Sequence, residues 1–403
     1  MKIIFSFLFI LLFRIGQAQP AKTFRFAFLS DTHIGSPDGK SEEDLRRSIA
    51  DINAMQDIAF VVITGDITEL GTNDELTRAK KIFDQLNVPF YIIPGNHDSG
   101  WSESGGVMFS KIFGYDQFSF EYAGIRFLGC PSGPYVRMSD GHVPRSSLNW
   151  LDKELKKLKP GQPLIFLNHY PIDNQLDNWY EITERLRHYN TWAILCGHGH
   201  TNKALVFEDI PGVMGRSNLR AKAEVGGFNL VDIRMDSMIF TERRPGVVTL
   251  DPWTGIKIEK RNYALNKTFS RPDYSINNKY AVIKERWRYS SDANIISSPA
   301  IFGDKLVVGN QNGKVVCLSL KDGKQIWSFL TQGSVFSSPA ASGGQVIFGS
   351  ADGYIYSLSG NTGKLNWKYK TGAAVMGSPV VLNKLIYIGG SDHSFLALDF
   401  QTG

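Results

Sequence analysis

Nine aspartate, asparagine and histidine residues in five short motifs have the types and spacing of a metal-dependent site. The motifs are Asp31-Thr32-His33, Gly65-Asp66, Gly95-Asn96-His97-Asp98, His169 and Gly197-His198-Gly199-His200. Carboxylate, imidazole and amide oxygen suit Mn, Fe, Co or Zn, and no thiolate is needed. Two such ions about 3.5–4 Å apart can clamp a phosphoryl oxygen and make a bound water acidic enough to attack phosphorus. These residue types therefore favour metal-assisted hydrolysis of phosphate esters.

Each motif directly follows an apolar stretch that predicts a β-strand. Expected strands are Phe24–Leu29, Phe60–Thr64, Phe90–Ile93, Ile125–Cys130, Leu164–Leu167 and Ala193–Cys196. Expected helices are Glu42–Met55, Asp74–Leu86 and Ser147–Leu158, with Ser41 and Asn73 as N-caps. This alternation predicts an α/β core of layered sheets whose strand-end loops gather the motifs at one edge.

Residue spacing within the motifs suggests which side chains bind the same metal ion. Side chains at i and i+2 of a strand point to the same side, so Asp31 and His33 are expected to bind one ion. His198 and His200 are expected to point from one turn towards two neighbouring ions.

The five motifs in this order resemble the signature of the calcineurin-like metallophosphoesterase family, over about residues 25–234. The resemblance implies a layered β-sandwich core with flanking helices and an enzyme with two divalent or trivalent ions. A hydroxide bridging these ions would attack a phosphodiester or phosphomonoester. Carried over position by position, Asp31, His33 and His200 would hold the first ion, Asn96, His169 and His198 the second, and Asp66 would bridge both. His97 would assist the leaving oxygen, and Asp98 would orient His97.

Further sequence features indicate which branch of the family the chain resembles. Glu69 stands where purple acid phosphatases have a tyrosine ligand, so the non-purple branch fits better. The run Thr64–Thr68 with Gly71, and Trp150-Leu151 after Gly141, are most similar to the bacterial cyclic-nucleotide and glycerophosphodiester branch. A protein phosphatase of the same family and a non-catalytic binding or scaffold protein are the alternatives. The presence of every ligand position favours an enzyme.

The C-terminal part repeats with a period of 40 residues. Trp287, Trp327 and Trp367 keep this step, as do three Ser-Pro pairs and two sets of glycines. Units of this length with four short strands are typical of propeller blades, and residues 287–403 resemble pyrroloquinoline-quinone-type repeats. We expect a partial all-β propeller of about three repeats.

Three units fall short of a closed ring, which typically has four or more blades. Continuation of the natural chain beyond Gly403, an open solenoid and closure by a second copy are all consistent with the pattern. A quinone-dependent oxidoreductase would need a closed ring. The repeats are therefore expected to form a ligand-recruiting or structural module, and the sequence does not identify what this module binds.

The N-terminus has the pattern of a secretory signal. Lys2 precedes the short apolar run Ile3–Phe13, and cleavage is expected after Ala18. The alternative is an uncleaved anchor. The predicted organisation is a signal peptide at 1–18, a phosphoesterase domain at 19–265, a linker at 266–279 and repeats at 280–403. The mature chain is expected to be exported, periplasmic or extracellular, without a membrane span.

The remaining composition says little about partners. The net charge of +5 is mild and no run of like charges predicts nucleic-acid binding. Cys130, Cys196 and Cys317 are expected to be buried free thiols, with a Cys130–Cys196 disulfide as the alternative. His142 is expected on a surface loop, with a place at the substrate mouth as the alternative.

Overall fold

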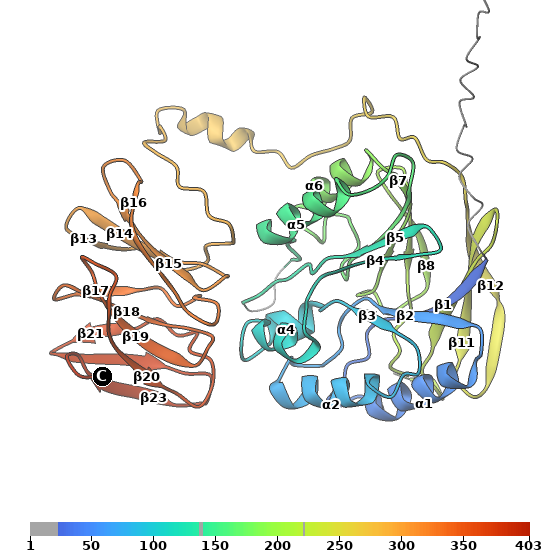
Figure 1. Cartoon of the computed structure of the whole chain (residues 1–403), viewed down its shortest axis with the longest axis horizontal. Helices are drawn as coiled ribbons and strands as arrows, with labels where there is room; N and C mark the ends of the chain where they lie inside the picture. Colours follow the sequence, from blue (N-terminus) through green and yellow to red (C-terminus); the bar gives the residue numbers. More distant parts are fainter. Residues whose placement is uncertain (1–22, 137–139, 221) are drawn as a thin grey trace, which may run out of the picture.

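The computed structural model describes residues 23–136, 140–220 and 222–403. The N-terminal part contains two six-stranded sheets (Figure 1). The first has the order β12-β11-β10-β1-β2-β3 and the second β4-β5-β6-β7-β9-β8. The strands of the first are β1 (Phe24–Leu29), β2 (Ile58–Ile63), β3 (Phe90–Ile92), β10 (Phe228–Ile233), β11 (Ser237–Arg244) and β12 (Val248–Lys257). Those of the second are β4 (Phe118–Tyr122), β5 (Ile125–Gly129), β6 (Pro163–Leu167), β7 (Asn190–Cys196), β8 (Lys203–Phe207) and β9 (Ile210–Met214).

The strands that carry the motifs run parallel. In the first sheet β1, β2 and β3 are parallel neighbours, and in the second β5, β6, β7 and β9 are. The carboxyl ends of parallel neighbours lie at the same edge of a sheet, so the loops that follow them gather there. Antiparallel strands extend both sheets outward from these parallel centres.

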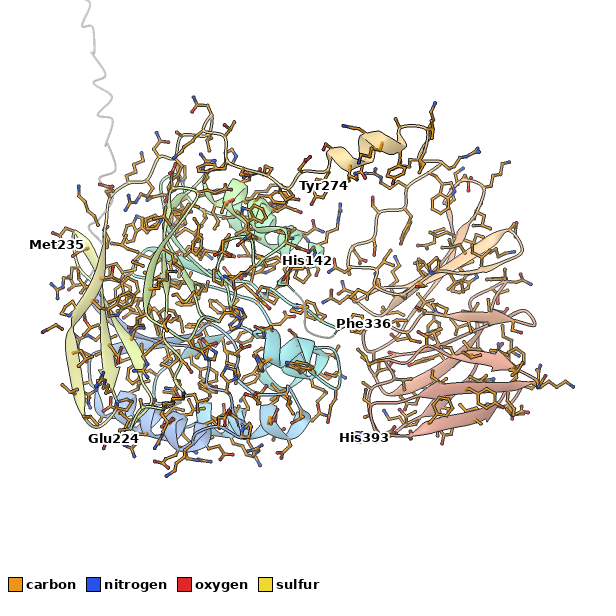
Figure 2. All side chains as sticks on the ribbon, turned by 180° about the vertical axis from the view of Figure 1, so that it is seen from behind. His142, Glu224, Met235, Tyr274, Phe336 and His393 are labelled. Carbon is orange, nitrogen blue, oxygen red and sulfur yellow. The ribbon has the colours of Figure 1, made fainter. Side chains whose placement is uncertain are left out.

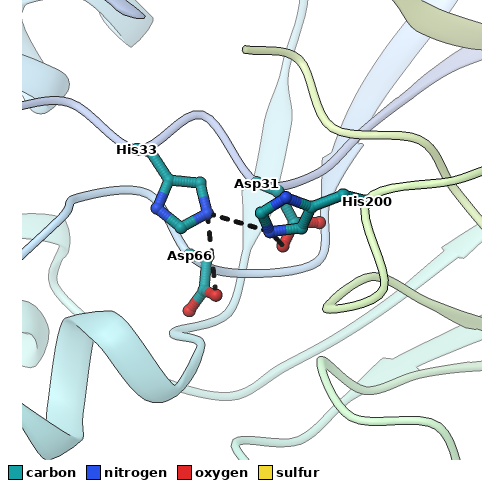
Figure 3. Close-up of side chains that lie close together, drawn as sticks. All are labelled: Asp31, His33, Asp66 and His200. Atoms are coloured by element: carbon teal, nitrogen blue, oxygen red, sulfur yellow. Dashed lines mark hydrogen bonds and ion pairs between the residues drawn. The ribbon is translucent and has the colours of Figure 1, made fainter. Parts of the chain in front are cut away.

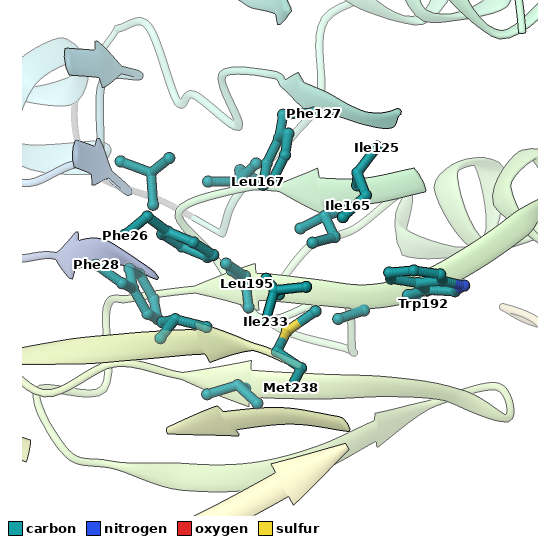
Figure 4. Close-up of a cluster of buried hydrophobic side chains, with 14 of the residues drawn as sticks. Phe26, Phe28, Ile125, Phe127, Ile165, Leu167, Trp192, Leu195, Ile233 and Met238 are labelled. Carbon is teal, nitrogen blue, oxygen red and sulfur yellow. The ribbon is translucent and has the colours of Figure 1, made fainter. Parts of the chain in front are cut away.

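A hydrophobic core fills the space between the two sheets. Phe26 and Phe28 of β1 belong to one buried cluster with Phe127, Ile165 and other residues of the second sheet (Figure 4). The alternate residues Ala27 and Leu29 belong to another cluster, on the outer face. This alternation follows from the two-residue period of a strand and makes the sheets a sandwich.

Helices cover both outer faces. α1 (Ser41–Ala54), α2 (Asn73–Phe83) and α4 (Val107–Phe113) share a buried cluster with the first sheet. α5 (Arg145–Leu155) and α6 (Trp179–Leu186) share one with the second. The expected layered α/β fold with flanking helices is therefore confirmed.

Two predicted helix caps are wrong. Ser41 is the first residue of α1 and follows the N-cap Lys40. Asn73 is the first residue of α2, and Thr72 is its cap: its hydroxyl accepts from the Glu75 N–H while the Glu75 carboxylate accepts from the Thr72 N–H. This reciprocal pair satisfies two otherwise unpaired donors, which is why the helix begins one residue earlier than expected.

The C-terminal part forms three antiparallel sheets, as the 40-residue period predicts (Figure 1). They consist of β13 (Ala300–Phe302) to β16 (Gln325–Leu330), β17 (Ala340–Ser342) to β20 (Leu365–Lys370), and β21 (Val380–Leu382) to β23 (Phe395–Asp399). The strands between are β14 (Lys305–Gly309), β15 (Lys314–Ser319), β18 (Gln345–Gly349), β19 (Tyr354–Ser359) and β22 (Leu385–Gly389).

The repeated tryptophans connect successive units. The indole of Trp287 donates to the Leu320 carbonyl, and the two later tryptophans make the equivalent bond 33 residues downstream. Gly323 lies beneath the Trp287 ring, where a Cβ would come within 2.5 Å. The constant step of these markers along the chain therefore reflects one repeated packing contact.

Other predictions concern the linker and the N-terminus. A 3₁₀ helix, η1 (Ser275–Tyr280), occupies part of the predicted linker. The predicted signal peptide at 1–18 lies outside the described residues. Among the residues that are described, no helix is both long and apolar enough to cross a membrane.

All three cysteines are buried free thiols, as expected. Burial raises the pKa of the Cys130 and Cys196 thiols well above the ordinary value.

Candidate metal centre

Five loops bring the sequence motifs together at one edge of the sandwich. The loops follow β1, β2, β3, β6 and β7, as the apolar stretches before the motifs predict. Backbone hydrogen bonds fix them to one another: the Asp31 N–H donates to the Gly65 carbonyl, and the His33 N–H donates to the Asp66 carbonyl. The Gly197 N–H likewise donates to the His169 carbonyl. The loops are thus fixed by their backbones as well as by their side chains.

The backbone at the motif residues is left-handed rather than extended. The φ angles are 53° at Asp31, 47° at His33, 48° at Asp66, 70° at His198 and 59° at His200. Asp31 and His33 were expected to point to the same side because they alternate on a strand. That reason is wrong, since neither residue has an extended backbone. Left-handed conformations are sterically unfavourable for residues with a Cβ and are concentrated at functional sites.

The first group of side chains consists of Asp31, His33, Asp66 and His200 (Figure 3). The Nε2 atoms of His33 and His200 are 3.2 Å apart. Nε2 of His200 is 3.4 Å from Oδ1 of Asp31, and Nε2 of His33 is 3.9 Å from Oδ2 of Asp66. Apart from His200, these residues are buried. Asp31 and His33 therefore do share one group, as expected.

The second group joins the first through Asp66. Oδ2 of Asp66 is 3.2 Å from Nε2 of His169. Oδ1 of Asn96 lies 2.8 Å from the same nitrogen and 3.0 Å from Nδ1 of His198. His198 and His200 thus point from one turn into different groups, as the sequence predicts.

The tautomer of His169 is set by a hydrogen bond to a backbone carbonyl outside the cluster. Its Nδ1–H donates to the Thr64 carbonyl at 2.7 Å, so its Nε2 faces the oxygens of Asp66 and Asn96. Burial lowers the pKa of His169, but the Asp66 and Asp31 carboxylates outweigh burial and raise it to about 9. In contrast, burial and the nearby His169 charge lower the pKa of His198 to about 4. The cluster favours a positive charge between its oxygens.

Glu69 is a residue that sequence reasoning did not assign to the site. Its carboxylate accepts from Nδ1–H of His33 at 2.9 Å, so His33 presents Nε2 to the first group. The backbone carbonyl of Glu69 accepts from Nδ1–H of His97 at 2.6 Å. An acidic residue three positions after Asp66, in a loop of the site, was the signal that could have identified it.

His97 lies beside the first group. Its ring centroid is 4.8 Å from that of His33, and the side chain is half-buried. Because the Glu69 carbonyl accepts from Nδ1–H, any proton that His97 gives to another group must come from Nε2. The backbone N–H of His97 donates to Oδ1 of Asp66 at 2.9 Å.

Asp98 does not orient His97, so that prediction is wrong. Its two oxygens instead accept from the N–H groups of Ile67, Thr68 and Gly95 and from the Thr68 hydroxyl. Burial and the nearby Asp66 raise the pKa of Asp98 to about 6 despite these bonds. Asp98 therefore joins the loop after β2 to the loop after β3. The helical turn α3 (Asn96–Gly100) that begins there directs its carboxylate back to Gly95, away from the imidazole.

His142 lies on an exposed loop, as expected, and its Nδ1 is 2.7 Å from Oδ1 of Asp177. It is separate from the two groups described above.

Two family models and several known proteins match parts of the chain. Residues 24–202 match a model of the calcineurin-like phosphoesterase family, and residues 284–403 match a model described as outer membrane protein assembly factor BamB. The chain is 30% identical to the probable glycerophosphodiester phosphodiesterase GpdQ of Arcobacter nitrofigilis, over 56% of this chain and 87% of the relative. It is 26% identical to a probable cyclic nucleotide phosphodiesterase of Fibrobacter succinogenes, over 48% of this chain and 80% of the relative.

The repeats are similar to the crystal structure of BamB from Moraxella catarrhalis, with 30% identity and a TM-score of 0.27. This similarity covers 29% of the present chain and 37% of the BamB chain.

Proposed function

Because the chain belongs to the calcineurin-like phosphoesterase family, we propose that it hydrolyses small phosphodiesters at a pair of metal ions. The main observation behind the proposal is the position of the Asp66 carboxylate between the two groups of side chains. Its carboxylate is 3.9 Å from His33 in one group and 3.2 Å from His169 in the other. A single carboxylate within reach of two clusters of donors is the arrangement that a bridged metal pair requires.

The donor set fits metal ions. His33 and His169 both use Nδ1–H outside the cluster, so their Nε2 atoms face other candidate ligand atoms, Nε2 of His200 and Oδ1 of Asn96 respectively. Acceptors that face one another repel unless a positive charge lies between them. Ligands of an ion with bonds of about 2.0–2.2 Å lie roughly 3 Å apart. The distances within the groups, from 2.8 Å to 3.4 Å for the closest pairs, agree with that spacing.

Two sets of residues would hold the ions. The first set is Asp31, His33 and His200, the second is Asn96, His169 and His198, and Asp66 would contact both. When bound, such ions acidify a coordinated water and neutralise charge on the phosphoryl oxygens. Nitrogen and oxygen donors without thiolate are compatible with Mn, Fe, Zn and Co.

The other residues of the site would hold the ligands in place and protonate the leaving oxygen. Glu69 fixes the His33 ring through Nδ1, as carboxylates commonly do for imidazole ligands. His97 would donate a proton from Nε2 to the leaving oxygen, since its Nδ1–H is bonded to Glu69. Asp98 keeps the Asp66 and Asn96 loops in register.

Phosphodiesters are favoured over other esters by the relatives. Both relatives described above carry phosphodiesterase names, and the chain covers most of their length. Their named substrates, glycerophosphodiesters and cyclic nucleotides, are the first compounds to test.

The test compares diesters, monoesters and a phosphopeptide with purified protein supplied with Mn, Zn or Fe. We expect diester hydrolysis that a chelator abolishes and an added divalent ion restores. Full activity in excess chelator would refute the proposed metal dependence. Activity confined to the phosphopeptide would instead favour a protein phosphatase.

We also propose that the protein is exported. The signal-like pattern of residues 1–18 and the similarity of the repeats to the BamB model support this proposal. N-terminal sequencing of protein from fractionated cells should find an envelope or medium fraction beginning at Gln19. Recovery from the cytoplasm with Met1 intact would contradict it.

A further inference from the structure

Residues 215–219, which directly follow β9, hold the backbone of two candidate metal ligands. The Ser217 hydroxyl donates to the Asp31 carbonyl at 2.7 Å, and the Ser217 N–H donates to the His200 carbonyl at 3.2 Å. Glu224, later in the same connection to β10, lies at the surface (Figure 2), whereas Ser217 is only 6% exposed. One buried serine therefore connects the backbones of two residues that belong to the first group of side chains.

Asp31 and His200 depend on such contacts more than ordinary residues do. Their φ angles of 53° and 59° are left-handed. This conformation is sterically unfavourable for a residue with a Cβ and persists only where the surrounding contacts impose it. The His200 side chain is also 49% exposed, so packing around its ring does little to hold it. The bonds from Ser217 thus lie where the backbone sets the direction of a ligand side chain.

Ser217 is itself anchored on both sides. The Arg216 guanidinium donates to the Ser217 carbonyl at 3.1 Å and to the Glu242 carboxylate of β11 at 2.6 Å. On the other side, the Asn218 side-chain amide donates to the Ser48 hydroxyl of α1 at 2.7 Å. These bonds to β11 and α1 do not involve candidate ligands, so Ser217 is a fixed point against which the ligands can be held.

The contacts of Ser217 are confined to one of the two groups. Within the described part of the chain, its hydrogen bonds include none with Asn96, His169 or His198. The second group is reached only indirectly, because the His198 N–H donates to the Asp31 carboxylate at 3.2 Å. Loss of the Ser217 hydroxyl is therefore expected to affect one ion much more than the other.

We propose that Ser217 is a positioning residue for the first metal ion, and that it acts by holding the backbones of Asp31 and His200. The inference rests on the proposed metal-dependent function. It assigns a role at the site to a residue outside the five sequence motifs.

The test measures metal binding without substrate, by equilibrium dialysis of metal-free protein against Mn²⁺. We expect Ser217→Ala to weaken one of two bound ions about 10–100-fold and the other less than about threefold. Ser217→Thr keeps a hydroxyl donor and should restore most of the lost affinity. The Leu219 N–H also donates to the Asp31 carbonyl, at 3.4 Å, so this carbonyl keeps a partner in Ser217→Ala and the variant is expected to fold.

Ser48→Ala is the matched control. Ser48 is also buried, and its hydroxyl accepts from Asn218, the next residue of the same segment. It lies on α1, outside both groups of candidate ligands. Each variant loses a buried hydrogen bond, so similar falls in Tm are expected, but Ser48→Ala should change the affinity for either ion less than about twofold.

The outcomes separate this inference from the proposed function. A wild-type protein that does not bind two ions overturns the proposed metal pair, and the inference with it. If the wild-type protein binds two ions and Ser217→Ala binds both as tightly, Ser217 does not position the first ion. Equal weakening by Ser217→Ala and Ser48→Ala, or no recovery in Ser217→Thr, would also overturn the inference, because the effect would then belong to the stability of the whole segment.

Discussion

Replacing His97 with alanine tests whether its imidazole protonates the leaving oxygen. Nδ1–H of His97 is bonded to the Glu69 carbonyl at 2.6 Å, so Nε2 can donate only when the ring is cationic. The backbone bond from residue 97 to Asp66, 2.9 Å long, remains in the variant. The folded state therefore loses one hydrogen bond, worth about 1 kcal/mol, whereas turnover should fall by about 10²–10⁴-fold.

The assay measures kcat for diesters whose leaving alcohols range from 4-nitrophenol to alkyl alcohols, with metal content determined in parallel. Alkyl leaving groups need a proton and should show the full loss, whereas 4-nitrophenolate leaves readily without one. His188→Ala, at an exposed histidine, is the control and should be unchanged. An equal loss across the series would refute the role as proton donor. A fall in metal content would place His97 among the ligands instead.

Three further changes test the site and the core. Asp66→Asn should leave well under two ions per chain, because Asp66 is within reach of both groups; two retained ions with unchanged rate would make it a loop residue only. Glu69→Ala should weaken metal retention about 10–100-fold by releasing His33, and Glu69→Gln, which can still accept from Nδ1–H, should restore part of it; wild-type affinity in both would exclude a positioning role. A thiol reagent at pH 8 should leave Cys130 and Cys196 unmodified until the protein is denatured, because burial removes access and raises their pKa; rapid labelling of the native protein would contradict that burial.

The sequence alone predicted much of this protein because its signals are local. An apolar run followed at once by Asp31, Asp66 or His169 marks both a strand and the edge at which it ends. Parallel strands bring such ends together whatever the intervening chain does, so the grouping of the motif residues follows from their places after predicted strands. The repeats were equally predictable, since one packing contact recurs every 40 residues and leaves Trp287 and its counterparts in fixed register.

Other features depend on contacts between distant segments and have no local pattern. The left-handed backbone at Asp31 and His33 is held by bonds to the loop after β2. The family resemblance implied that Asp98 orients His97, but a helical turn directs neighbouring side chains in different directions.

The sequence by itself therefore determined which residues could bind metal, which strands carry them and where the repeats recur, because each depends on residue type and short spacing. Only the tertiary structure decided that Glu69 fixes His33 and that Asp98 joins two loops. These arrangements join segments that touch in space but are far apart in sequence. Such contacts depend on how the whole chain packs, and short sequence patterns do not specify them.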